Sequence, residues 1–288
     1  MKKFMKVFIY CTGLAALCLI MQAIASVPVT VFFIVKHSLP HILSGNPEAF
    51  MSVDINRVLH DTVLPAYLLS GVLTFSSAWI IHALFRRKFI ERLSFKRTSP
   101  VLIIVSFITG CSLQMPISFI MALLENAGVA PDLFEQYSKS IEPLVSNQNI
   151  ILQILAVGIM APLIEEIIFR GLIFNNLKKN IPIPAALVIQ ALLFGIVHLN
   201  IIQGSYAFVV GIILGLFVLW SNSLFLPVAV HMGMNLSGIV LSEFGEGISN
   251  TGSMFMLIIS FILVPVCMLF LYFKTREKTI AENYSLLG

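Results

Sequence analysis

The sequence predicts an all-α fold, a polytopic membrane helix bundle, from three observations. Hydrophobic residues make up 58% of the 288 residues and charged residues 11%, whereas a typical soluble domain is about 25% charged. Apolar stretches of about 20 residues, the length that spans a bilayer as a helix, recur along the chain. Lys and Arg gather in alternate connections between these stretches. Because so little charge cannot cover a soluble globule, lipid is the expected solvent for much of the chain.

Eight apolar segments, separated by polar residues, proline or glycine, are predicted to cross the membrane. The segment 206–220 is the shortest of them and is marginal as a span, since about 20 residues are needed. In chain order the predicted spans are 4–35, 58–85, 101–124, 150–177, 184–203, 206–220, 224–242 and 254–273.

The distribution of basic residues predicts the orientation of these spans, because cytoplasmic loops carry an excess of Lys and Arg. With an even number of spans and a cytoplasmic N-terminus, only Lys36, Arg57 and Lys139 of the 18 basic residues lie outside. Both termini are therefore predicted to be cytoplasmic, in a multi-pass protein of the cell membrane. The outer connections, chiefly 36–57 and 125–149, collect the acidic residues Glu48, Asp54, Glu125, Asp132, Glu135, Glu142, Glu243 and Glu246.

The first predicted span has an alternative interpretation as a cleaved signal peptide. Lys2, Lys3 and Lys6 precede its apolar run, and residues 23–25 resemble a signal-peptidase site. However, the run continues through Ile34, which is too long for the apolar part of a signal peptide. A retained helix is favoured.

The basic stretch 86–97 interleaves its cations with apolar residues. It fits either an interfacial helix on the inner leaflet or a plain stop-transfer loop. Nucleic-acid binding is not predicted, because the chain lacks clustered basic residues beside polar or aromatic readers. Neither a disulfide framework nor a zinc cluster is predicted, because no CxxC spacing occurs among Cys11, Cys18, Cys111 and Cys267.

Polar residues that lipid should exclude form three clusters within the predicted spans. An ionisable side chain at membrane depth costs about 2.5 to 3.5 kcal/mol or more unless it is paired or faces a polar cavity. From their positions in the spans, the clusters can share one layer of the bundle. They are Glu165, Glu166 and Arg170 in the fourth span, Phe194 and His198 in the fifth, and His231 and Asn235 in the seventh.

Helical spacing assigns different roles to the two carboxylates. Glu166 and Arg170 are four residues apart on one helix face, so they are predicted to form a buried ion pair. Glu165 is rotated by about 100° and lacks that partner, which suits it to act as a general base. His231 and Asn235 are also four residues apart, so two donors can point at one spot.

This pattern suggests hydrolysis of a peptide bond by an activated water molecule. Glu165 and His198 would activate the water, while His231 and Asn235 would stabilise the oxyanion. Phe194, one turn before His198, would hold that ring in place. Pro162, one turn before Glu165, removes a backbone hydrogen bond and is predicted to kink the fourth span and make room for water.

The same residues resemble the CPBP family, the CAAX protease and bacteriocin-processing (Abi) intramembrane proteases. The family pattern is EExxxR, FxxxH and HxxxN on separate membrane helices, and all three motifs occur here in that order. The resemblance implies an intramembrane endopeptidase with the same assignment: catalytic Glu165, His198, His231 and Asn235, supported by Glu166, Arg170 and Phe194. Its substrate would be a membrane-associated protein or peptide within the lipid bilayer. CAAX-type processing, peptide maturation and bacteriocin immunity all remain open as roles.

The resemblance covers roughly residues 105–243 and divides the chain into three parts. Residues 1–104 would hold N-terminal spans and the basic loop, 105–243 the catalytic core, and 244–288 the last span and cytoplasmic tail. No cofactor is predicted for the leading interpretation. One alternative is a zinc protease with Glu165, His198 and His231 as ligands, although no HExxH motif is present. Others are a transporter that uses the buried Glu/His cluster, and a non-catalytic scaffold.

Overall fold

The computed structural model describes residues 2–43, 54–145 and 149–285, and throughout this part of the chain the regular structure is helical. Among these described residues, seven helices are long and apolar enough to cross a membrane. The predicted polytopic bundle is therefore confirmed, and the chain is a multi-pass membrane protein. These helices are α1 (Lys2–Leu43), α2 (Ile55–Leu84), α4 (Pro100–Asn126), a composite helix (Ile150–Leu177), α10 (Ile201–Ser221), α11 (Phe225–Phe244) and α12 (Asn250–Ser285).

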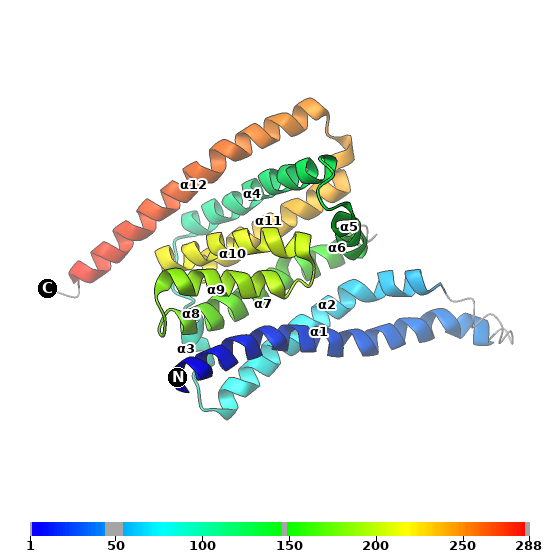
Figure 1. Cartoon of the computed structure of the whole chain (residues 1–288), viewed down its shortest axis with the longest axis horizontal. Coiled ribbons are helices and arrows are strands. Elements are labelled where there is room, and N and C mark those ends of the chain that lie inside the picture. The colour runs from blue at the N-terminus through cyan, green and yellow to red at the C-terminus, as the bar shows by residue number, and fades with distance from the viewer. Residues whose placement is uncertain (1, 44–53, 146–148, 286–288) are drawn as a thin grey trace.

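The helices form a bundle with two outer layers around a central one (Figure 1). On one side α1 and α2 pack along each other, and on the other side α12 packs against α4. The composite helix lies in the centre, where it contacts α1, α2 and α11. Two of the three polar clusters, those of the composite helix and of α11, thus sit on helices that pack against each other.

The predicted fifth span, 184–203, is wrong in its length. The helix found there, α9 (Ile183–Ile196), has 14 residues and is too short to span a bilayer on its own. Asn200 ends the apolar stretch as the N-cap of α10, where its side chain accepts a hydrogen bond from the Gln203 amide at 3.0 Å. Conversely, α10 has 21 residues, so the span predicted to be marginal has full length.

Two of the connections between the spans contain short helices. Within the outer loop 125–149 lies α5 (Pro131–Val145), which buries Phe134 and places the Tyr137 hydroxyl 3.4 Å from that of Tyr206. Within the basic stretch lies α3 (Phe89–Leu93), whose two terminal residues are buried in the bundle. The acidic residue Glu48 lies outside the described residues.

The composite helix is built from five segments of alternating geometry. They are α6 (Ile150–Gln153), η2 (Ile154–Met160), α7 (Ala161–Glu165), η3 (Glu166–Phe174) and α8 (Asn175–Leu177), of which η2 and η3 are π-helical. A π-helix bonds each N–H to the carbonyl five residues back, and such segments are often found at functional sites. The two π-helical segments, η2 and η3, continue the direction of the composite helix but change which residues share a face.

Two glycines allow α4 and α11 to pack with their backbones in direct contact. A Cβ atom on Gly110 would overlap the carbonyl oxygen of Val230, and one on Gly233 would overlap that of Phe107. Because the obstacle in both cases is backbone, rotation of a side chain cannot relieve it. Gly233 lies between His231 and Asn235, so this contact also fixes the height of those two side chains.

The Gly110→Ala variant is expected to destabilise the bundle by about 1 to 3 kcal/mol, the usual cost of an overpacked contact. The measurement is thermal unfolding of the purified protein in detergent. Gly13→Ala is the matched control, because Gly13 also lies in a spanning helix and a Cβ there meets no atom within 4 Å. That control should be neutral or stabilising, since alanine is the better helix former. Equal melting temperatures for the two variants would contradict the contact.

Candidate active site

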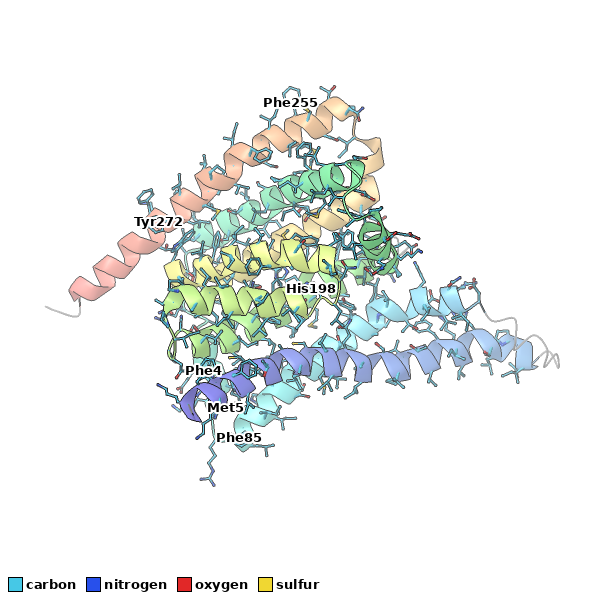
Figure 2. All side chains as sticks on the ribbon, viewed as in Figure 1. Phe4, Met5, Phe85, His198, Phe255 and Tyr272 are labelled. Atoms are coloured by element: carbon cyan, nitrogen blue, oxygen red, sulfur yellow. The ribbon has the colours of Figure 1, made fainter. Side chains whose placement is uncertain are left out.

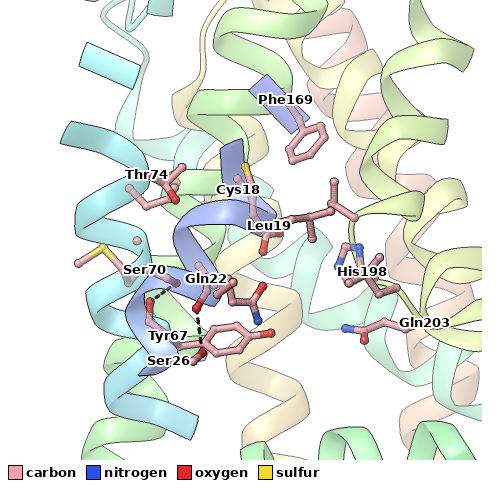
Figure 3. Close-up of a pocket in the computed structure, with 18 residues that line it drawn as sticks. Cys18, Leu19, Gln22, Ser26, Tyr67, Ser70, Thr74, Phe169, His198 and Gln203 are labelled. Atoms are coloured by element: carbon pink, nitrogen blue, oxygen red, sulfur yellow. Dashed lines mark hydrogen bonds between the residues drawn. The ribbon is translucent and has the colours of Figure 1, made fainter. Parts of the chain in front are cut away.

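A cavity of about 360 Å³ lies between the α1–α2 pair and the central helices. Figure 3 shows its lining, and Figure 2 places His198 near the middle of the bundle. Glu165 at the end of α7 and His198 both line this cavity, together with polar residues from other helices. Two of the predicted catalytic residues therefore line the same cavity.

The two adjacent carboxylates face different surroundings, as their spacing predicts. The Glu165 side chain is 28% exposed and lines the cavity, whereas the Glu166 side chain is 0% exposed. The predicted ion pair is confirmed, with Arg170 Nη1 donating to Glu166 Oε1 at 2.8 Å. Arg170 is equally buried, and its Nη2 donates to the Gly211 carbonyl at 3.4 Å. Glu165 is thus left as the accessible carboxylate.

His231 bridges the two carboxylates. Its Nδ1 lies 2.9 Å from Glu166 Oε1, where it donates, and its Nε2 lies 3.7 Å from Glu165 Oε2. Glu166 therefore accepts from both Arg170 and His231, and this fixes which imidazole nitrogen faces Glu165. Unlike Glu165 and His198, His231 is buried and does not line the cavity.

Asn235 does not point at the same spot as His231 in this structure. Its Nδ2 donates to the Val157 carbonyl at 2.8 Å. In η2 the Ala161 N–H bonds to the Ala156 carbonyl, five residues back. The next donor in that register would be residue 162, but proline has no N–H. The Asn235 amide therefore supplies the hydrogen bond that Pro162 cannot give to Val157.

The Asn235→Ala variant is expected to lower the stability of the fold by about 1 to 3 kcal/mol, because the Val157 carbonyl loses its donor inside the bundle. Pro162→Ala restores a backbone N–H at the position that serves Val157. The double variant should therefore recover most of the loss, which thermal unfolding in detergent can measure. If Pro162→Ala gives no recovery, the compensation between these two residues does not exist.

Phe194 joins the two histidines and the arginine. Its ring packs edge to face with His198 at 5.0 Å and with His231 at 5.8 Å between centroids, and the Arg170 guanidinium lies 4.3 Å from the ring centroid. Such aromatic and cation–π contacts orient the partners as well as stabilise them. The predicted packing of Phe194 on His198 is confirmed, and the ring holds three of the other site residues in place.

His198 lies in the turn after α9 and not in a spanning helix, which corrects its predicted location. Its Nδ1 donates to the Phe194 carbonyl at 2.7 Å, so the neutral ring keeps Nε2 as its proton acceptor. The chain reverses direction immediately afterwards, with Leu199 at a positive φ of 53°. The turn gives the ring access to the cavity that a position inside a packed helix would lack.

The first two helices supply cavity residues that the sequence motifs do not include. Five polar side chains of these helices line the cavity: Gln22 and Ser26 of α1, and Tyr67, Ser70 and Thr74 of α2. Figure 3 labels all five, across the cavity from His198. They recur every three or four residues within otherwise apolar spans. This polar helix face is the signal that could have located them.

The geometry does not fit the zinc alternative. In the part of the chain that the structure describes, no group of three His, Cys, Asp or Glu side chains is arranged to hold a metal ion. The Nδ1 atoms of His198 and His231 donate to Phe194 and Glu166, so Nε2 is the nitrogen of each ring that remains for a further contact. Glu165, His198 and His231 are therefore treated below as proton-transfer groups.

The fold and the site together define a multi-pass membrane protein with a buried Glu/His/Arg centre. Residues 147–237 match a family model described as type II CAAX prenyl endopeptidase Rce1-like. A relative, the membrane-embedded CAAX protease MroQ of Staphylococcus aureus (strain USA300), is 31% identical over 108 residues, which is 35% of this chain and 44% of the relative. This region of the chain is therefore similar to CAAX proteases. The alignment thus spans less than half of the relative's length, and no solved structure matches.

Proposed function

We propose that the protein is an intramembrane endopeptidase that hydrolyses a peptide bond in a membrane-associated protein or peptide. The observation that carries this proposal is that Glu165 and His198 line one cavity inside a membrane-spanning bundle. A partly accessible carboxylate and an imidazole with a free Nε2 are the groups that hydrolysis by activated water requires. The family model and the relative that the chain resembles are both described as CAAX proteases, which supports the same class of reaction.

In the proposed reaction, Glu165 takes a proton from a water molecule that His198 Nε2 orients. The water oxygen attacks the peptide carbonyl carbon, and the C–N bond then breaks as Glu165 returns the proton to the leaving amine. The carbonyl oxygen carries negative charge in the intermediate, and preorganised donors stabilise it. No cofactor is needed.

The proposed oxyanion donors are His231 and Asn235. Support for His231 is its Nε2, which Glu166 holds toward Glu165. Because Nδ1 already donates to Glu166, Nε2 donates to the oxyanion in the doubly protonated form of the ring, which two adjacent carboxylates stabilise. Asn235 has two Nδ2 hydrogens, and the bond to Val157 uses one of them. The second remains for the intermediate, so its structural and catalytic roles are compatible.

The proposed substrate class follows from the setting of the cavity. Because α1 and α2 form one wall of it, a substrate reaches Glu165 through a space that spanning helices enclose. The relative's description as a CAAX protease favours a C-terminal segment of a membrane-anchored protein over the other family roles, peptide maturation and bacteriocin immunity.

The experiment that tests the function compares protein termini in membranes that contain the wild type, His198→Ala or His60→Ala. His60 is the control because it lies on α2 outside the cavity. Mass spectrometry should find a new terminus with the wild type and with His60→Ala, and should lose it with His198→Ala. Identical termini in all three membranes would refute a protease. Stoichiometric zinc in purified protein, with cleavage sensitive to chelators, would replace the glutamate mechanism by a metal-dependent one.

A further inference from the structure

A second cavity, of about 470 Å³, lies at the end of the bundle where the chain begins. Its walls come from the start of α1, the connection from α2 to α3, α3 itself, and the C-terminal end of the composite helix with the turn that follows it. The size is typical of a ligand site. It is separate from the candidate active site, with which it shares no lining residue.

The lining of this cavity is strongly basic. It contains Lys3, Lys6, Arg87, Arg92 and Lys179 and no carboxylate. Within the described residues none of these five side chains forms an ion pair with an acidic side chain, whereas the neighbouring Lys88 pairs with Glu91. Five unneutralised cations from three separate segments therefore converge on one space and favour an anionic ligand.

A buried amide in the same wall needs a hydrogen-bond donor. Asn175 is 7% exposed and lines the cavity. Both of its Nδ2 hydrogens are used, because Nδ2 donates to the Arg92 and Gly171 carbonyls at 3.0 Å each. Its Oδ1 is buried and has no partner in the protein. A ligand that carries a hydroxyl beside its anionic group would satisfy it.

The surroundings of the cavity are apolar and face outward. Phe4 and Phe8 on α1, and Leu84 and Phe85 at the end of α2, are each more than half exposed. Figure 2 shows Phe4, Met5 and Phe85 at this end of the molecule. In a membrane these side chains lie beside acyl chains, while the cations lie at headgroup depth.

We propose that this cavity binds the headgroup of an anionic phospholipid, with the phosphate among the five cations and a headgroup hydroxyl at Asn175. The ligand's acyl chains would lie along the exposed apolar side chains of α1 and α2. The predicted orientation places the site in the inner leaflet. The proposal does not depend on the proposed peptidase activity.

The test is native mass spectrometry of the full chain in detergent with phosphatidylglycerol, phosphatidylcholine or glycerophosphoglycerol, the headgroup without acyl chains. We expect the wild type to retain phosphatidylglycerol at least tenfold more than phosphatidylcholine. The Lys6→Gln/Arg87→Gln variant should lose about tenfold in phosphatidylglycerol binding. The matched control Arg86→Gln/Lys88→Gln removes the same charge from residues outside the cavity and should stay within twofold of the wild type. Lys6→Arg/Arg87→Lys should also retain binding, and it separates charge from misfolding.

If the two charge-removing variants lost phosphatidylglycerol binding equally, the lipid would be held by diffuse electrostatic attraction to this end of the molecule. That result would overturn the proposal. Equal binding of glycerophosphoglycerol and phosphatidylglycerol would assign the cavity to a soluble phosphate ester instead of a lipid. Binding of hexaglutamate in the absence of any phosphatidylglycerol binding would assign it to an acidic peptide.

Discussion

The Glu165→Gln variant is expected to lower the turnover of peptide cleavage about 1,000-fold, within the range that general acid–base catalysis contributes. Glutamine has nearly the same shape but cannot take the proton from water. The fold should tolerate the change, because Glu165 is partly exposed and His231 Nε2, the ring atom that faces it, is 3.7 Å away. The measurement is single-turnover cleavage in proteoliposomes, with a substrate found by the comparison of termini.

Glu135→Gln is the matched control for this experiment. Glu135 lies on the surface of α5, where its carboxylate pairs with Lys139. Such exposed pairs contribute little to stability, and the residue does not line the cavity. Its cleavage rate should stay within about twofold of the wild type, as no catalytic proton transfer is lost. Cleavage by Glu165→Gln at the same rate would remove Glu165 from the mechanism.

The Arg170→Met variant is expected to destabilise the protein by about 3 to 5 kcal/mol, because it leaves the Glu166 carboxylate buried without the guanidinium that pairs with it. Both side chains are 0% exposed, so water cannot replace the lost hydrogen bonds. Methionine keeps much of the packing volume and thereby isolates the charge effect. Thermal unfolding in detergent should show a melting temperature lower by at least about 6 °C.

A double variant separates loss of the pair from loss of volume. Arg170→Met/Glu166→Gln removes both charges and should be more stable than Arg170→Met alone, because no uncompensated charge remains. Arg57→Met is the control for the general effect of the substitution, since Arg57 is exposed in the first turn of α2. If Arg170→Met melts like Arg57→Met, the buried pair contributes nothing measurable.

The sequence predicted those parts of the site that depend on local helical spacing. Glu166 and Arg170 are four residues apart, and their ion pair follows from that number even though the segment is π-helical. The Phe194 and His198 rings are in contact because they too are four residues apart. Membrane spans were also predictable, because the need to satisfy backbone groups inside lipid leaves helices as the available structure.

Contacts between helices far apart in the chain could not be predicted from spacing. The bridge from His231 to Glu166 joins residues 65 positions apart, and the bond from Asn235 to Val157 joins residues 78 positions apart. The location of His198 in a turn was missed because hydropathy continues across the boundary between α9 and α10. Only the capping side chain of Asn200 marks that boundary in the sequence.

The π-helical geometry of η2 amounts to extra residues accommodated within a continuous helix. Each π-type turn closes its hydrogen bond over one residue more than an α-type turn. If one residue were deleted from this segment, the remaining residues could form an ordinary α-helix. The helix after the deletion would then be rotated by about 100° about its axis. That rotation would carry Glu165 off the cavity wall. The length of residues 154–160 is therefore as much a part of the site as the identity of its side chains, and a single deletion there should be as damaging as the loss of the carboxylate.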